Sequence, residues 1–248
     1  MHTGLTRTAI HADHAVVTPE SYVPLQVPGF DNALTVVLIS AELGADFAQY
    51  RVTGEGHSRL NPLGPTREYF WLLRSGSATL TVNGAQQTLG VDDYAFLPAS
   101  TAWTIEGREA FELIGFEREY EPLPGVSLPA PVVQPLAAVP AEPFLGDEGA
   151  LLQTLLPEGP AFDWGVNLFE FAPGGTLPQV ESHFMAHGLF VLGGQGVYRL
   201  GDRWYPVVAG DAIWMAPYLL QWYVAAGKTP TRYLYFKVMN RVPRCSNR

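Results

Sequence analysis

The sequence is poor in the residues that several common protein classes need. It has one cysteine, Cys245, so neither an intrachain disulfide nor a cysteine-rich zinc module can form. Its first 20 residues lack the apolar core of a signal peptide, and no stretch reaches the ~18 consecutive apolar residues of a membrane-spanning helix. From these absences we expect a soluble protein of a reducing compartment, the cytoplasm, that has no membrane partner.

Basic residues are also scarce. Lys and Arg number 15 against 24 Asp and Glu, which gives a formal net charge of −9. Because such a chain repels phosphate groups, we expect no nucleic acid as a partner. Hydrophobic residues make up 47% of the chain and charged residues 16%, as is typical of a folded globular protein. The 25 Gly and 21 Pro indicate many turns and therefore β structure.

What the sequence does contain is an internal repeat. Gly76 aligns with Gly194 at an offset of 118 residues (194 − 76), and in that register Asp93 aligns with Asp211 without a gap. Each copy has short alternating strands separated by Gly-rich turns and lacks a clear 3.6-residue apolar periodicity. This pattern predicts two equivalent all-β barrels or sandwiches, with one candidate helix at residues 149–156.

A proline-rich segment separates the two copies. Residues 122–143 hold seven of the 21 prolines, which favours extended, polyproline-like backbone over regular strand or helix. We therefore predict an N-terminal half at residues 1–121, a linker at residues 122–143 and a C-terminal half at residues 144–248.

Two of the six histidines lie in one short segment of the second copy. Glu181 and His183 are two residues apart, so on a strand both side chains project from one face, and His187 follows four residues later. One carboxylate and two imidazoles form a donor set suited to Mn²⁺, Fe²⁺ or Zn²⁺. The first copy has no such set at the equivalent positions, which are Leu63, Pro65 and Tyr69. We expect a metal site in the second copy only.

Other interpretations of these residues stay open. A helical zinc-protease motif would need Glu after the first histidine, and Phe184 stands there, so that interpretation fails. The three side chains would alternatively serve only as hydrogen-bonding groups at a barrel mouth. A fourth ligand has to come from a later strand, for which Gln221 is the candidate, although a single Gln is more often an ordinary hydrogen-bonded side chain.

The last predicted strand carries a polar face. Tyr233, Tyr235 and Lys237 alternate with apolar residues, so they share one side of the strand. Near a metal, a lysine with two tyrosines is suited to hold an anionic substrate. The same alternation also fits an ordinary solvated strand face.

These residues resemble the two motifs of the cupins. Residues 175–194, which contain Glu181-x-His183-x-x-x-His187, are similar to the first motif, and residues 210–221, which end at Gln221, are similar to the second. Two copies joined by a linker look like a bicupin, a pair of tandem double-stranded β-helix (jelly-roll) barrels. More specifically, residues 194–237, with ESHFMAH before them, resemble the (S)-ureidoglycine aminohydrolases of the ureide pathway, in which purines and allantoin are degraded.

The resemblance implies a metal-dependent C–N hydrolase. Such an enzyme releases ammonia from (S)-ureidoglycine, a small anionic ureide, and forms (S)-ureidoglycolate. The resemblance implies Mn²⁺, in preference to Fe²⁺ or Zn²⁺, bound by Glu181, His183, His187 and Gln221. It implies substrate contacts from Glu181, Gln221, Tyr233 and Lys237. Candidates for proton transfer are Glu181, Tyr233 and Lys237, and self-association into a homo-oligomer is expected.

Two other functions are compatible with the sequence. A non-haem iron dioxygenase uses the same two histidines and one carboxylate, but Gln221 on the metal would occupy a position that O₂ needs. A storage or ligand-sensing bicupin would perform no catalysis. A sensor usually carries a helical DNA-binding module, and no segment at either end of the sequence has that pattern.

Overall fold

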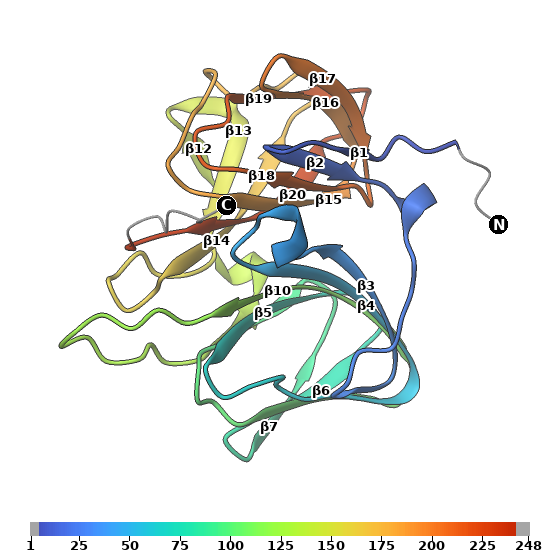
Figure 1. Cartoon of the computed structure of the whole chain (residues 1–248), viewed down its shortest axis with the longest axis vertical. Coiled ribbons are helices and arrows are strands. Elements are labelled where there is room, and N and C mark those ends of the chain that lie inside the picture. The colour runs from blue at the N-terminus through green and yellow to red at the C-terminus, as the bar shows by residue number, and fades with distance from the viewer. Residues whose placement is uncertain (1–4, 242–248) are drawn as a thin grey trace. The chain divides into compact units, whose positions relative to one another are not determined.

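The computed structural model describes residues 5–241, and nearly all of their regular structure is β-strand (Figure 1). Contacts divide the chain into two compact units. The first unit comprises residues 22–42 and 46–139, and the second comprises residues up to Ser21, Leu43–Ala45 and the residues from Pro140 on. The all-β prediction with two strand-built units is therefore confirmed. None of the helices in residues 5–241 has the length and apolar character needed to cross a membrane, and Cys245 lies outside the described residues.

The first unit is a single curled sheet with an interior of aromatic rings. Its strands pair in the order β11 (Val132–Pro135), β8 (Asp93–Leu97), β5 (Arg67–Ser75), β10 (Ala110–Glu119), β4 (Ala48–Leu60), β9 (Trp103–Gly107), β6 (Ala78–Val82) and β7 (Ala85–Leu89), with β3 (Phe30–Ile39) beside β4. Tyr69 stacks on Trp71 and meets Trp103 edge-on, with ring centroids 6.3 and 5.0 Å apart. Tyr69 and Trp103 occupy the repeat positions of His187 and Gln221, so rings fill the place where the second unit carries polar side chains.

The second unit consists of two sheets around one core. The larger sheet has the order β1 (Ala9–Ile10), β2 (His14–Val17), β18 (Ala212–Met215), β15 (His187–Gly193), β20 (Thr231–Val238), β14 (Trp164–Phe171), β13 (Asp147–Thr154) and β12 (Glu142–Phe144). The smaller sheet has the order β17 (Arg203–Val208), β16 (Gln195–Leu200) and β19 (Gln221–Ala226). Side chains of both sheets meet in a buried cluster that includes Phe169, Tyr198 and Tyr233.

The internal repeat is visible in one turn that both units build alike. Asp93 Oδ2 accepts a hydrogen bond from Gly90 N at 2.7 Å, and Asp211 Oδ2 accepts one from Val208 N at 2.9 Å. Each aspartate closes a turn over the three residues before it, which leads into β8 in one unit and β18 in the other. The register deduced from the sequence therefore pairs residues with the same structural role.

The N-terminal residues belong to the second unit, which differs from the predicted boundary at residue 121. Strand β2 pairs antiparallel with β18, with Val16 opposite Ile213. Without β2 the hydrogen-bonding edge of β18 would be unpaired, and open edges of this kind are generally covered. The predicted N-terminal half thus loses its first 21 residues to the unit at the other end of the chain.

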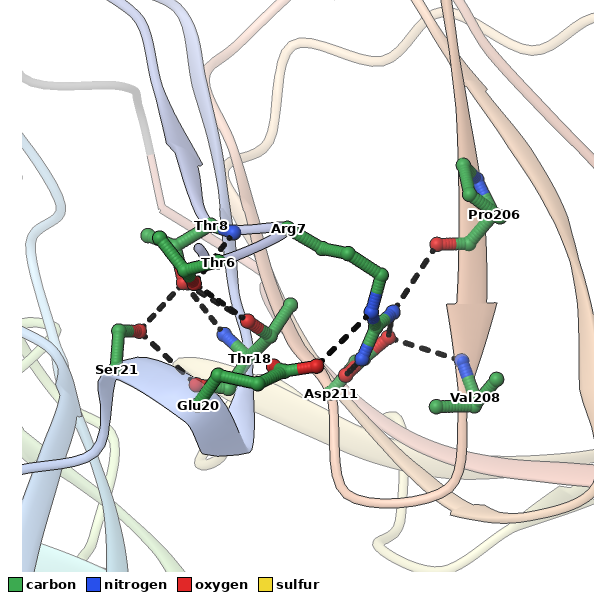
Figure 2. Close-up of polar contacts among 9 residues, drawn as sticks. All are labelled: Thr6, Arg7, Thr8, Thr18, Glu20, Ser21, Pro206, Val208 and Asp211. Carbon is green, nitrogen blue, oxygen red and sulfur yellow. Dashed lines mark hydrogen bonds and ion pairs between the residues drawn. The ribbon is translucent and has the colours of Figure 1, made fainter. Parts of the chain in front are cut away.

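An ion pair and a set of hydroxyl groups fasten this segment (Figure 2). Arg7 donates two hydrogen bonds to the carboxylate of Asp211, at 2.7 and 2.9 Å. Thr8 Oγ1 lies 3.0 Å from Thr18 Oγ1 and 2.5 Å from Ser21 Oγ. Because the Asp211 side chain is fully buried, its charge depends on the two-fold contact with Arg7 for compensation.

Two further expectations differ from the structure. The segment at residues 122–143 is partly strand, because β11 pairs with β8 and β12 begins at its end. Residues 149–156, the candidate helix, lie largely in strand β13, so the helix prediction is wrong. Ala150 and Leu152, two residues apart, both pack in the core, which is the two-residue spacing of a strand.

Candidate active site

A cavity of about 270 Å³ lies in the second unit. Its apolar wall is built from the core residues Phe144, Leu152, Phe169, Leu177, Leu189 and Met215. Its polar wall includes all six residues selected from the sequence, which are Glu181, His183, His187, Gln221, Tyr233 and Lys237. The structure therefore brings the complete predicted set into one place, while the role of each residue stays a prediction.

Backbone pairing holds Glu181 and Gln221 opposite each other. The two residues form an isolated antiparallel bridge, in which each N–H donates to the carbonyl of the other at 2.9 Å. Directly opposed residues of an antiparallel pair project their side chains to the same side. The carboxylate and the amide therefore enter the cavity together, although 40 residues separate them in the sequence (221 − 181).

The two histidines reach the same place from the segment before β15 and from its first residue. His183 Nε2 lies 3.2 Å from Glu181 Oε2, and the ring centroids of His183 and His187 are 5.3 Å apart. The backbone of this segment is attached to the loop before β19, because Tyr218 N donates to His183 O at 2.5 Å and Ser182 Oγ donates to Tyr218 O at 3.0 Å. The loop contacts thus set the position of His183.

The surroundings of His187 favour its neutral form. Burial lowers the pKa of His187 to about 3, and repulsion from the Lys237 ammonium acts in the same direction. The imidazole is neutral near pH 7, which is the protonation state that binds metal ions.

Strand β20 supplies the facing wall. Its pairing with β15 places Lys237 opposite His187 and Tyr235 opposite Leu189. Tyr235 accepts a hydrogen bond from Asn167 Nδ2 at 2.7 Å. Burial lowers the pKa of Lys237, whereas the carboxylates of Glu158 and Glu181 oppose this shift. The alternation seen in the sequence therefore does put Tyr233, Tyr235 and Lys237 on one cavity wall.

Tyr198 joins two of the predicted site residues. Its hydroxyl donates to Gln221 Oε1 at 2.8 Å and is also hydrogen-bonded with Tyr233. Burial raises the pKa values of Tyr198 and Tyr233 well above the ordinary value of 10.0, so both phenols are protonated. The hydrogen bond from Tyr198 consequently holds the Gln221 amide in one orientation.

Sequence reasoning missed two polar residues of this cavity, Tyr198 and Glu158. Tyr198 lies on a strand of alternating apolar residues, where a tyrosine looks like any core aromatic. Glu158 lies in the loop between β13 and β14, which matches no motif. In neither case does the local sequence contain a signal that separates a site residue from an ordinary one.

The donor set fits a divalent cation in kind. Glu181 offers a carboxylate oxygen, the two histidines offer imidazole nitrogens and Gln221 offers an amide oxygen, all lining one cavity. Within residues 5–241, no three His, Cys, Asp or Glu side chains already converge as a metal centre, and Glu181 instead pairs with His183. Carboxylate, imidazole and amide groups are the ligands of Mn²⁺, Fe²⁺ and Zn²⁺, so the arrangement is consistent with a divalent metal.

Comparison with known proteins extends this picture. Residues 167–237 match the family model described as a cupin domain. A protein of Oryza sativa subsp. japonica named "Probable (S)-ureidoglycine aminohydrolase" is 42% identical, over 97% of this chain and 77% of its own length. The (S)-ureidoglycine aminohydrolase of Arabidopsis thaliana is 41% identical, over 97% of this chain and 80% of its own. The crystal structure of protein Ylba from E. coli has a TM-score of 0.86 at 29% identity, over 97% of both chains.

These similarities extend over both units rather than over the cupin match alone. The bicupin prediction is thereby confirmed, as is the resemblance deduced from residues 194–237. With its cavity side chains, its two barrels and its nearly full-length similarity to named hydrolases, the chain belongs to the (S)-ureidoglycine aminohydrolase family.

Proposed function

We propose that this protein is a manganese-dependent hydrolase that converts (S)-ureidoglycine into (S)-ureidoglycolate and ammonia. The observation that carries the proposal is the convergence of Glu181, His183, His187 and Gln221 with Lys237 on one cavity. The activity is the one that the relatives at 41% and 42% identity have in their names.

The charges of the cavity suit a small anion. Glu181 is the only charged group among the four proposed metal donors, so a divalent cation bound to them retains about one net positive charge. Lys237 adds a second cationic group on the facing strand. A substrate carboxylate is attracted by both, and the apolar wall around Phe169 and Leu177 strengthens that attraction by excluding water.

We propose that Mn²⁺ is held by Glu181, His183, His187 and Gln221. A metal bound there supplies a Lewis acid and a template for the substrate. The hydrogen bond from Tyr198 fixes the orientation of the Gln221 side chain, and His187 is positioned as the first residue of β15. The chain's own contribution is therefore a set of four donors that enter one cavity from separate segments of the second unit.

The remaining polar groups orient the substrate and handle protons. In the reaction the bond between the chiral carbon and the amine breaks, a C–O bond to water forms, and the amine leaves as ammonia. Tyr233 and Lys237 are suited to hold the substrate carboxylate, which selects one enantiomer by fixing the groups around the chiral carbon. Because burial lowers the pKa of Lys237, its ammonium gives up a proton more readily than an exposed lysine, as a general acid toward the leaving amine requires.

The test is ammonia release from ureidoglycine generated in situ. The metal-free protein should be inactive, the protein with Mn²⁺ should release ammonia, and neither allantoate nor ureidoglycolate should replace the substrate. Metal analysis after native purification separates this proposal from an iron dioxygenase. Activity that survives the double change Glu181→Ala and His187→Ala would overturn the assignment.

A further inference from the structure

The proposed substrate has an end that the proposed metal donors and Lys237 leave unmatched. Ureidoglycine ends in a ureido group, –NH–CO–NH₂, with three N–H bonds, and N–H groups are bound by acceptors. Lys237 only donates hydrogen bonds, and Glu181 is assigned to the metal. The tyrosine hydroxyls of the cavity are neutral acceptors, so a further carboxylate would bind the ureide N–H groups more strongly.

Glu158 is such an acceptor. Among the described residues that line the cavity, Glu158 and Glu181 are the two carboxylates. Glu158 lies on the loop between β13 and β14, and its charge influences both Lys237 and Tyr235 on the wall that faces the histidines. A carboxylate at this place can accept two N–H groups at once, as it does with the paired N–H groups of arginine.

The loop that carries Glu158 is tied down by the end of the strand that carries Lys237. Asn240, which follows β20, donates from Nδ2 to the carbonyl oxygens of Glu158, Gly159 and Phe162, at 3.2, 3.0 and 2.9 Å. Met239 N donates to Asp163 O at 2.8 Å. The loop thus has a defined position relative to β20, although Glu158 itself is exposed.

We propose that Glu158 is a specificity-determining residue that accepts hydrogen bonds from the carbamoyl N–H groups of the substrate. The inference rests on the proposed function, since it names the part of the ureide that this side chain binds. Lys237 and the metal donors hold the carboxylate end, and Glu158 selects ligands that end in N–H donors over ligands that end in a carboxylate or a methyl group. Asn240 acts as a positioning residue by holding the loop.

Binding of two ligands separates this role from a general effect on the cavity. (S)-Ureidoglycolate carries the ureido group, and glycolate is the same hydroxy acid with a hydrogen atom in its place. With Mn²⁺ present, Glu158→Ala should weaken ureidoglycolate binding by about 10- to 100-fold, the loss expected for a charge-assisted hydrogen bond, and should change glycolate binding less than about 2-fold. Unchanged glycolate binding also shows that the variant is folded and that its metal site is intact.

Two further variants sharpen the measurement. Glu148→Ala removes an exposed carboxylate of the same unit that does not line the cavity, and it should bind both ligands as the wild type does. Asn240→Ala retains the Glu158 carboxylate but removes three hydrogen bonds that hold its loop. It should weaken ureidoglycolate binding by a smaller factor than Glu158→Ala and again leave glycolate binding unchanged.

The outcomes are decisive in both directions. An equal loss for the two ligands would show that Glu158 acts only through Lys237, and no loss for either would show that it makes no contact; each result overturns the proposal. Failure of the proposed function looks different, because the wild-type protein with Mn²⁺ would then release no ammonia from ureidoglycine, whatever the variants bind.

Discussion

Glu181 and Gln221 exchange both of their backbone hydrogen bonds, at 2.9 Å each, across an isolated bridge. The bridge places the carboxylate and the amide side by side in the cavity. His183 and His187 complete the four proposed metal donors. Since the bridge uses backbone atoms only, either side chain can be changed without removing the pairing that places it. This property makes the proposed donor set accessible to single substitutions.

Glu181→Gln should reduce manganese binding without unfolding the protein. The change removes the only negative charge among the proposed donors and retains nearly the same size. We expect Mn²⁺ affinity to fall by more than ~100-fold, beyond the ~10- to 100-fold typical of residues that only support a ligand. Calorimetric titration measures it, and the rise in melting temperature on adding Mn²⁺ should disappear in parallel. Glu142→Gln, which changes an exposed residue of β12, serves as the control. If Glu181→Gln binds Mn²⁺ as tightly as this control does, the assignment of Glu181 is contradicted.

Tyr198→Phe should weaken activity through Gln221. The phenol donates to Gln221 Oε1 at 2.8 Å, and its loss lets the amide rotate. We expect kcat/KM to fall by about 10-fold or more, with a loss of stability of only about 1 kcal/mol for the missing hydrogen bond. Tyr94→Phe, in the other unit, is the control. The Tyr94 hydroxyl is also buried, and it accepts a hydrogen bond from Gln134 Nε2 at 2.5 Å. If the two variants lose activity equally, the positioning role is wrong.

Arg7→Ala should destabilise the second unit. Asp211 is fully buried and would retain a charge whose main partner is gone, while the Arg7 side chain is 33% exposed. Breaking a buried pair costs about 3–5 kcal/mol, and the partial exposure of Arg7 points to the lower end, about 3 kcal/mol. Urea unfolding measures the loss. Arg59→Ala breaks the exposed pair with Glu106 and should cost less than about 1 kcal/mol, so similar costs for both variants would contradict this account.

His14 should make the stability of the protein depend on pH. Burial lowers the pKa of His14 below 6.5, although Asp13 opposes the shift with a 2.7 Å contact. The unfolded chain takes up a proton near pH 6.5 and the folded chain does so only at lower pH. The contribution of neutral His14 to the free energy of unfolding is therefore complete above pH 6.5. It is lost as the pH falls, by at most about 1.4 kcal/mol per pH unit. Unfolding free energies at pH 7.5, 6.0 and 5.0 should fall less steeply for His14→Gln, and parallel profiles would refute the prediction.

Local patterns were sufficient for much of this description. A repeat at a fixed offset requires no knowledge of distant contacts, and Gly76 and Gly194 indeed share a φ of +77°, where a side chain would be strained. The two-residue spacing that puts Tyr233, Tyr235 and Lys237 on one side of β20 is likewise a property of a short segment. Such spacing does not explain the segment before β15, where Glu181 and His183 lie in no named strand and are placed by one bridge and by loop contacts.

Such local patterns could not predict contacts between distant segments. The pairing of β2 with β18 joins residues almost 200 positions apart, such as Val16 and Ile213. Tyr198 differs from a core tyrosine only in facing Gln221, and Glu158 differs from a surface glutamate only in the loop contacts of Asn240. The amino-acid sequence alone thus predicted two β units and the four proposed donors. Only the tertiary structure determines which strand completes the second unit and which side chains surround the donors. Both depend on long-range strand pairing and on burial, which no local sequence period encodes.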